Sequence, residues 1–158
     1  MRVGVLSDTH GAIEKAMRAI QKKMGEIDAL IHAGDLYSDA LQLRSLLSIP
    51  VYAVSGNCDI FSQGQEELVF SLEGCKFYIT HGHLYRVKND LQLLRERAKE
   101  IGAQVTVFGH THIPCNRKEG GILLFNPGSA SRPLPGQQAC CGILKVEKGK
   151  ACGKLLYI

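Results

Sequence analysis

Short apolar runs alternate with amphipathic segments through the first third of the chain. Three apolar runs that end in polar residues, as buried strands do, are Val3–Leu6, Asp28–Asp35 and Val51–Ser55. Between them, Ala12–Gly25 and Ser38–Leu47 carry apolar residues at helical spacing, and Ser38 or Asp39 is expected to cap the second helix. This alternation predicts parallel strands joined by right-handed crossover helices.

The pattern changes after a polar loop at residues 60–65. Three pairs of strand-like runs flank short turn sequences, which predicts hairpins. The pairs are Glu67–Leu72 with Cys75–Thr80, Ile113–Arg117 with Ile122–Phe125, and Ala139–Val146 with Ala151–Tyr157. Between the first two pairs, the sequence predicts a helix from a cap at Asn89 to Ile101, then a strand at Gln104–Phe108. Because no repeat or linker interrupts the chain, we expect residues 1–158 to form one α/β domain.

Composition and charge narrow the class of protein. The 158 residues are 45% hydrophobic and 22% charged, which is typical of a globular protein with a real core. The net charge of +4 is concentrated on two predicted helices, Lys15–Lys23 and Arg86–Lys99, so we expect solvated helix faces and no nucleic-acid site. No run is long enough for a signal or membrane segment, and the six cysteines form no C-x-x-C pair. We therefore expect a cytoplasmic protein with reduced thiols and no membrane partner; homo-oligomerisation stays open.

Five of the predicted strands run into side chains that can bind metals. These side chains are Asp8 and His10, Asp35, Asn57, His81, and His110 with His112. Asp8 and His10 are two residues apart, so in an extended segment they point to the same side. Taken alone, Asp8 could equally cap the following helix. Four of the six histidines belong to this set, however, and carboxyl ends of strands are where open α/β sheets bind ligands.

The number of donors favours two metal ions over one. Seven nitrogen and oxygen donors exceed the four to six positions around a single first-row ion, with room left for solvent. Two ions about 3.5–4 Å apart share a carboxylate, and Asp35 is the best bridge because it stands alone after Gly34. A bridging water would then lose a proton near neutral pH and attack an electrophile, for which phosphorus is the natural choice.

The ordered motifs resemble those of a known superfamily. Asp8-x-His10, Gly34-Asp35, Gly56-Asn57-x-Asp59, Thr80-His81-Gly82-His83 and Gly109-His110-x-His112 resemble the motif set of the calcineurin-like metallophosphoesterases over residues 1–132. The short chain and Asn126-Pro-Gly-Ser look like the small single-domain bacterial and archaeal phosphodiesterase branch. The resemblance implies a four-layer α/β/β/α sandwich, in which two mixed β-sheets are flanked by helices.

The resemblance also implies roles for individual residues. One ion would take Asp8, His10, Asp35 and His112, and the other Asp35, Asn57, His81 and His110. Manganese is the ion that we favour, with nickel, iron, zinc or magnesium as alternatives. Outside these sets, His83 could contact the phosphate or support His81, and His32 could be a packed supporting residue.

One position departs from the superfamily. Cys58 stands where the wider superfamily has a histidine thought to assist the phosphate or the leaving oxygen, although the small branch often lacks it. A thiol with a pKa near ~8.5 is a poor substitute for an imidazolium near ~6.5. Asn57, Asp59 and His83 are therefore the candidate catalytic residues, although Asp59 suits orientation of its loop better than acid catalysis. Asn57, His83 and Arg132 are the candidate substrate contacts, and Asn126–Arg132 could equally be a plain connection.

These observations predict a dinuclear metal-dependent phosphodiesterase. Its bridging hydroxide would attack a small or activated phosphodiester, which is the expected partner. One alternative is a weakly active or inactive protein-binding scaffold, because the fold also looks like that of the eukaryotic retromer subunit. Another is a phosphomonoesterase of the same superfamily. A scaffold could lose metal ligands freely, and all seven are present in this chain.

Overall fold

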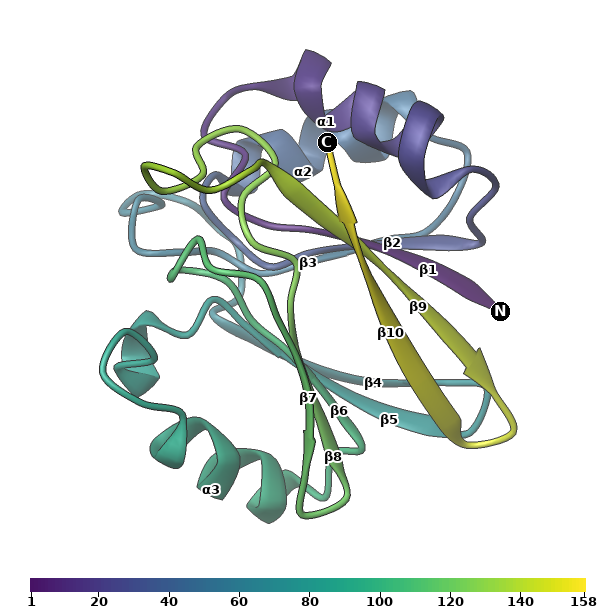
Figure 1. The fold of residues 1–158 in the computed structure, drawn as a ribbon, viewed down its shortest axis with the longest axis vertical. Coiled ribbons are helices and arrows are strands. Elements are labelled where there is room, and N and C mark those ends of the chain that lie inside the picture. Colours follow the sequence, from purple (N-terminus) through teal and green to yellow (C-terminus); the bar gives the residue numbers. More distant parts are fainter.

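Two five-stranded mixed β-sheets pack face to face, and helices cover both outer faces (Figure 1). The computed structural model describes residues 1–158. In the first sheet, β1 (Arg2–Leu6), β2 (Ala29–His32) and β3 (Val51–Ala53) are parallel. β9 (Cys140–Glu147) pairs antiparallel with β1, and β10 (Lys150–Tyr157) with β9. This arrangement confirms the four-layer α/β/β/α sandwich.

The second sheet has a parallel centre and antiparallel edges. β5 (Cys75–Thr80), β6 (Val105–Val107) and β8 (Ile122–Asn126) are parallel. β4 (Glu67–Leu72) and β7 (Cys115–Glu119) pair with β5 and β8 through the predicted hairpins. The carboxyl ends of β5 and β6 therefore lie side by side, as do those of β1, β2 and β3 in the first sheet.

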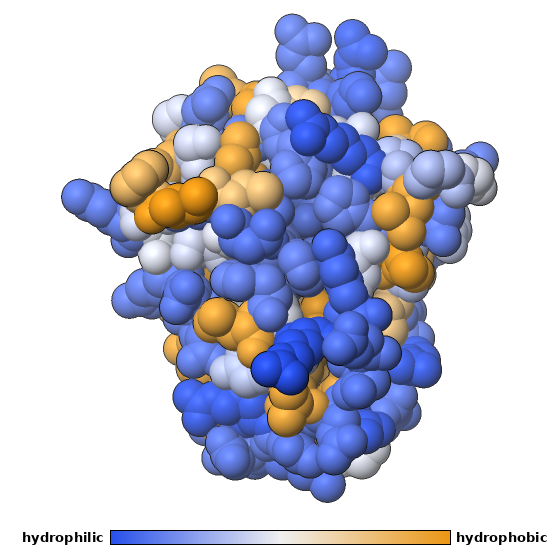
Figure 2. All heavy atoms as spheres, turned by 90° about the vertical axis from the view of Figure 1, so that its left-hand side faces the viewer, coloured by the Kyte–Doolittle hydropathy of each residue, from blue (hydrophilic) through white to orange (hydrophobic).

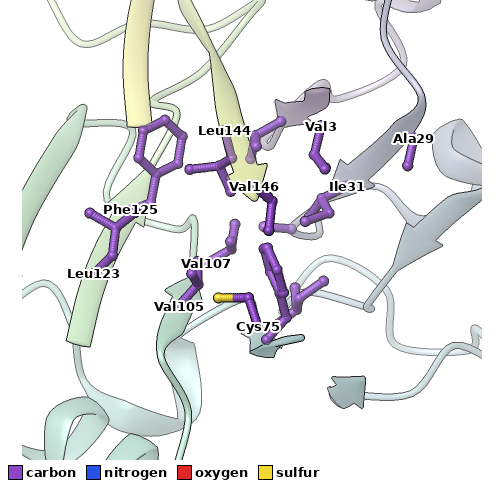
Figure 3. Packing of buried hydrophobic residues seen from close by; sticks show 14 of the residues in the cluster. Val3, Ala29, Ile31, Cys75, Val105, Val107, Leu123, Phe125, Leu144 and Val146 are labelled. Atoms are coloured by element: carbon purple, nitrogen blue, oxygen red, sulfur yellow. The ribbon is translucent and has the colours of Figure 1, made fainter. Parts of the chain in front are cut away.

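Alternation along the strands builds the core between the sheets. In β1, Val3 and Val5 point to the other sheet, whose β5 contributes Phe77 and Ile79. Figure 3 shows part of this cluster, with Val105, Val107 and Phe125 of the second sheet facing Ile31 and Leu144 of the first. Gly4 faces the helices, where a Cβ atom would collide with Met24 and Ile27. The absence of a side chain at Gly4 lets a helix lie close to the sheet.

Two helical layers complete the sandwich. α1 (Ile13–Ala19), its π-helical continuation η1 (Ile20–Met24) and α2 (Tyr37–Leu46) cover the first sheet (Figure 1). α3 (Gln92–Ile101) covers the second, with Leu94 and Ala98 buried as its apolar spacing predicts. None of the helices combines the length and apolar character needed to cross a lipid bilayer.

The predicted helix caps are wrong at both helices. Residue 36, not Ser38 or Asp39, precedes the first turn of α2, and no side chain caps that helix. Asp39 instead turns inward and bonds to the loop after β1. Before α3, residues His83–Tyr85 form a short 3₁₀ helix, η2, so α3 begins at Gln92 and not after Asn89. The residue before the first turn is Leu91, and no side chain caps α3, although Asp90 accepts a hydrogen bond from the Gln92 backbone N–H at 2.8 Å in the preceding turn.

Candidate metal centre

The loops at the carboxyl ends of both sheets bring six of the seven predicted ligands into one cluster. Asp8 and His10 follow β1, Asp35 follows β2, His81 follows β5, and His110 and His112 follow β6. The side chains of Asp8, Asp35 and His81 are almost completely buried, whereas the three others are partly open to solvent. The seventh ligand, Asn57, is exposed on the loop after β3.

The potential donor atoms converge around Asp8 Oδ1. The Nε2 atoms of His112, His81 and His10 lie 3.1, 3.9 and 4.0 Å from this oxygen. His81 Nε2 also lies 3.5 Å from Asp35 Oδ2, and the Nε2 atoms of His10 and His112 are 3.4 Å apart. Two ligands about 2.1 Å from a shared ion lie about 3.0–4.2 Å apart, depending on the angle between them, so these separations suit metal ligands.

Two buried atoms of the cluster support this interpretation. Asp8 Oδ1 and His81 Nε2 are buried, and neither has a hydrogen-bond partner. Such atoms are costly unless something else satisfies them. The other oxygen of Asp8 is held by the Ser7 hydroxyl at 2.6 Å and the His110 backbone N–H at 3.2 Å. A divalent cation fits the donor set, because carboxylate and imidazole ligands suit such ions and leave positions for solvent.

Three overlapping groups can each hold an ion. Within each group, the donor atoms lie within 4.8 Å of one another. The groups are Asp8, His10 and His112; His10, Asp35 and Cys58; and Asp8, Asp35 and His81. Asp35 thus contributes both to the side of His10 and to the side of His81. The charge of Asp35 is well stabilised, since contact with His81 and hydrogen bonds from Cys58 lower its carboxyl pKa despite the opposing effect of burial.

Backbone carbonyls fix the orientation of two histidines. His81 Nδ1 donates to the Ala33 carbonyl at 2.7 Å, and His112 Nδ1 donates to the Arg132 carbonyl at 2.6 Å. Each bond selects the tautomer whose Nε2 lone pair faces the cluster. His110 lies beside His81, with ring centroids 5.1 Å apart. Burial and the charges of His81 and Lys88 lower the pKa of His110 to about 4, so its ring is neutral and free to bind.

Left-handed backbone conformations gather at these loops. Five of the residues in the cluster have positive φ angles: Asp8 (53°), His10 (44°), Asp35 (47°), His110 (67°) and His112 (58°). Each such non-glycine residue costs of order 1–3 kcal/mol and persists only where the surrounding structure enforces it. Their concentration at one place indicates a site whose geometry is maintained for function.

Glycines let the loops approach one another closely. A Cβ atom on Gly109 would collide with Ser7 Oγ and lie 2.8 Å from Asp8 Oδ2, and one on Gly56 would collide with Asp35. Gly34 has a φ of +95°, and a Cβ atom there would lie 2.7 Å from the His81 ring. These glycines of the sequence motifs therefore make room for the ligands themselves.

Gly109→Ala is expected to displace Asp8, and therefore to weaken metal binding more than tenfold while destabilising the fold by about 1–3 kcal/mol. Isothermal titration with Mn²⁺ and thermal unfolding measure the two effects. Gly142→Ala is the matched control, because its Cβ would collide with the Phe125 ring in the core, away from the ligands. The control should lower stability only. Equal metal affinity in both variants would contradict the proposed role of Gly109.

The loop after β3 joins the cluster through its backbone and through Cys58. The Cys58 N–H donates to Asp35 Oδ1 at 3.1 Å, and its thiol donates to Asp35 Oδ2 at 3.2 Å. Burial, the hydrogen bond to Asp35 and nearby carboxylates raise the pKa of this thiol to about 11. Asn57 Nδ2 lies 3.6 Å from Cys58 Sγ, which places Asn57 at the same edge of the cluster.

Asp59 is occupied with its own loop. One of its oxygens accepts from the Tyr37 backbone N–H at 2.8 Å, and the other accepts from the Gly56 N–H at 2.7 Å. Its placement agrees with loop orientation and leaves no free oxygen for acid catalysis. His83 is partly buried, with its ring centroid 5.6 Å from that of His81, and its Nδ1 has no partner.

The turn-rich segment 126–132 lies directly against the cluster. Ser129 Oγ and Ser131 Oγ donate to the Asp8 carbonyl at 2.8 and 3.1 Å. Asn126 Nδ2 donates to the Gly109 carbonyl at 2.9 Å, and the carbonyl of Arg132 orients His112. Of the two interpretations that the sequence left open, the structure thus favours an approach to the site over a plain connection.

A buried relay behind the cluster joins the loops after β1 and β2. The Gly34 N–H donates to His32 Nδ1 at 3.3 Å, and His32 Nε2 donates to Thr9 Oγ1 at 2.9 Å. Thr9 Oγ1 in turn donates to Asp39 Oδ2 at 2.6 Å. Burial lowers the pKa of His32 to about 4, so a neutral ring serves as both acceptor and donor. His32 is therefore a packed residue that supports the loops of the cluster, the role that the sequence analysis considered for it.

Several supporting residues could not be identified from the sequence. Asp39 had the position of a helix cap, but it accepts hydrogen bonds from Thr9 and from the Gly11 backbone N–H. Ser7, Ser129 and Ser131 are small polar residues in turns, where such residues are common for local reasons. Only the proximity of Ser7 to Asp8, and of the serines to Asn126-Pro127, could have suggested a role.

Comparisons with known proteins place the cluster in context. Residues 1–149 match the family model of the calcineurin-like phosphoesterase superfamily domain. The probable metallophosphoesterase YsnB of Bacillus subtilis is 35% identical over 151 residues, covering 96% of this chain and 88% of YsnB. The phosphodiesterase YfcE of Escherichia coli K12 is 31% identical over 170 residues, covering 91% of this chain and 87% of YfcE. The crystal structure of wild-type Vps29 of Entamoeba histolytica complexed with zinc has the same fold, with a TM-score of 0.79 and 21% identity over 99% of both chains.

Proposed function

The chain belongs to the calcineurin-like phosphoesterase superfamily, and we propose that it is a dinuclear metal-dependent phosphodiesterase acting on a small phosphodiester. The observation that carries this proposal is the cluster of donor atoms around Asp8 Oδ1. A buried carboxylate oxygen and a buried imidazole nitrogen without partners face three further ligands and Asp35. Relatives named as metallophosphoesterases and a phosphodiesterase support the same class of reaction.

We assign the ligands to two sets that share Asp35, although Asp8 also lies close to Asp35 and His81. Asp8, His10 and His112 form one set, and His81 and His110, with Asn57 at the rim, form the other. When bound, two divalent ions would neutralise the charge of a phosphodiester and supply an activated water. The chain's own contribution is to hold the ligands without further reorganisation, through the carbonyls that orient His81 and His112.

Three residues at the open side are candidates for contact with the substrate. Asn57 and Arg132 are exposed, and His83 is partly buried. The Arg132 carbonyl accepts a hydrogen bond from His112, so this exposed residue lies beside the cluster. A guanidinium at this position suits a phosphodiester anion, since it can donate two parallel hydrogen bonds.

Arg132→Ala is expected to raise KM about tenfold or more, since a hydrogen bond to a charged group is worth about 1.5–3 kcal/mol. The metal content should not change, because the Arg132 carbonyl still orients His112. Steady-state kinetics on bis(4-nitrophenyl) phosphate measure the effect. Arg132→Lys should recover part of the loss, and Arg18→Ala on the exposed face of α1 is the control. An unaltered KM would show that the Arg132 side chain does not contact the substrate and that only its backbone carbonyl contributes to the site.

Hydrolysis of matched esters tests the proposed function. Metal-loaded protein should hydrolyse bis(4-nitrophenyl) phosphate, and hydrolyse 4-nitrophenyl phosphate at least tenfold more slowly. A chelator should abolish both activities, and Mn²⁺ should restore them. Preference for the monoester would favour a phosphomonoesterase. No hydrolysis of either ester by protein with both ions bound would favour a binding scaffold.

A further inference from the structure

A cavity of about 760 Å³ lies beside the loop that carries His110 and His112. Its apolar wall is formed by residues from the segment before α3, from the end of β6 and from two loops. These residues are Val87, Leu91, Phe108, Ile113 and Leu134. A volume of this size is typical of small-molecule sites, which combine an apolar wall with a few polar groups.

Two lining residues connect this cavity to the candidate metal centre. Thr111 lies between His110 and His112, and its hydroxyl accepts from Asn126 Nδ2 at 3.0 Å. Leu134 follows Arg132, whose carbonyl orients His112. The cavity therefore lies next to the loop that carries His110 and His112, with Thr111, Ile113 and Leu134 in its lining.

Exposed apolar side chains mark the cavity on the surface. Ile113 is 46% exposed and Leu134 is 38% exposed, and both line it. Figure 2 views the molecule from the side on which these loops lie, and there apolar side chains interrupt a mainly hydrophilic surface in separate groups. Apolar groups that stay exposed beside a polar centre are typical of ligand-binding sites.

Lys88 supplies a positive charge to the cavity. It lines the cavity, and its charge acts on both His110 and His112. A cation next to an apolar wall suits a ligand that is anionic at one end and apolar at the other. A phosphodiester with an apolar substituent has this chemistry, because its single negative charge lies on the phosphate.

We propose that this cavity binds the non-leaving substituent of the phosphodiester substrate, and that the substituent is an apolar, preferably aromatic, group. The inference rests on the proposed phosphodiesterase function and adds the substrate class. Polar residues, among them Asn89, Asp90 and Asn116, line the rest of the cavity, but only an apolar substituent gains free energy by burial against the exposed side chains of Ile113 and Leu134. An aryl substituent would bury its faces there while the phosphate stays at the metal centre.

Two substrates with one leaving group isolate the substituent. Phenyl 4-nitrophenyl phosphate and methyl 4-nitrophenyl phosphate both release 4-nitrophenolate. The ratio of their kcat/KM values therefore measures the preference of the enzyme for a phenyl over a methyl substituent. In Ile113→Ser/Leu134→Ser this ratio should fall at least tenfold, since apolar contacts of this size are worth about 10–200-fold. Only the kcat/KM of the phenyl ester should fall, while that of the methyl ester should not change. Leu134→Met should keep the ratio, as should Phe61→Ser, which changes a side chain that is 97% exposed and outside the cavity.

A binding measurement separates failure of this inference from failure of the proposed function. By isothermal titration of the metal-loaded protein, phenylphosphonate should bind at least tenfold more tightly than methylphosphonate, and the double variant should lose this difference. An unchanged ester ratio and an unchanged difference in affinity in the double variant would overturn the inference. Absence of hydrolysis of both esters would overturn the proposed function, while the titration would still decide whether the cavity accepts an aryl group.

Discussion

Asp35→Asn is expected to abolish hydrolysis, with a loss of at least about 10³-fold in kcat/KM, since removal of even one electrostatic contact to a transition state costs about 10²–10³. The variant should also lose metal. Asp35 lies close to both His10 and His81, as Asp8 also does, and it is the carboxylate that the motif resemblance assigns to both ions. An amide has no negative charge to share between two cations, so occupancy of both positions should fall.

The pattern of metal loss distinguishes a bridge from an ordinary ligand. In Asp35→Asn, metal analysis after gel filtration should find both equivalents reduced, whereas His112→Ala should reduce mainly one. Asp28→Asn is the matched control, because Asp28 is exposed and bonds to the Arg2 backbone N–H, away from the cluster. Full activity of Asp35→Asn with one ion per chain would rule out the shared carboxylate.

Cys58→His is expected to raise kcat on alkyl phosphodiesters by up to about 10²–10⁴-fold, the usual contribution of a general acid. Without an acid, the leaving oxygen departs as an anion. This slows the departure of alkoxides most and that of aryl oxides least, because alkoxides are the stronger bases. The Cys58 thiol lies 3.2 Å from Asp35 Oδ2, so an imidazole at this position would start beside the ligands. The unmodified protein should therefore show a steep dependence of kcat on leaving-group pKa.

A series of phosphodiesters with aryl and alkyl leaving groups measures this slope. Cys58→His should flatten the slope, while Cys58→Ala should change it little, because the thiol is not expected to donate a proton to the leaving group. Metal content must be equal in the three proteins for the comparison to hold. Loss of activity in Cys58→Ala with both ions still bound would show that the thiol has another role in the reaction.

The sequence predicted the layers of this fold because short-range patterns determine them. Val3 and Val5 alternate with Gly4 in β1, and Glu73-Gly74 fixes the hairpin of β4 and β5. The helix starts were wrong because capping side chains have competing partners. Asp39 was expected to cap its own helix, yet it accepts a bond from Thr9, 30 residues away. Such long-range pairing leaves no local trace in the sequence.

The candidate ligands could be found in the sequence because they follow strands in a fixed order. Their orientation could not, since it depends on contacts between distant loops. The Ala33 carbonyl that orients His81 is 48 residues away, and Ser129 reaches the Asp8 carbonyl across 121 residues. Backbone carbonyls exist at every residue, so no residue type identifies these contacts. Gly109 and Gly56 were visible as motif residues, but the collisions that they avoid become clear only in three dimensions.

The number of metal ions required for activity tests the central proposal most directly. Metal-free protein titrated with Mn²⁺ should bind two ions per chain, and hydrolysis of bis(4-nitrophenyl) phosphate should rise mainly as the second ion binds. The same titration with His81→Ala should stop near one ion and leave little activity. Full activity at one ion per chain, with no further increase as the second binds, would contradict the dinuclear phosphodiesterase.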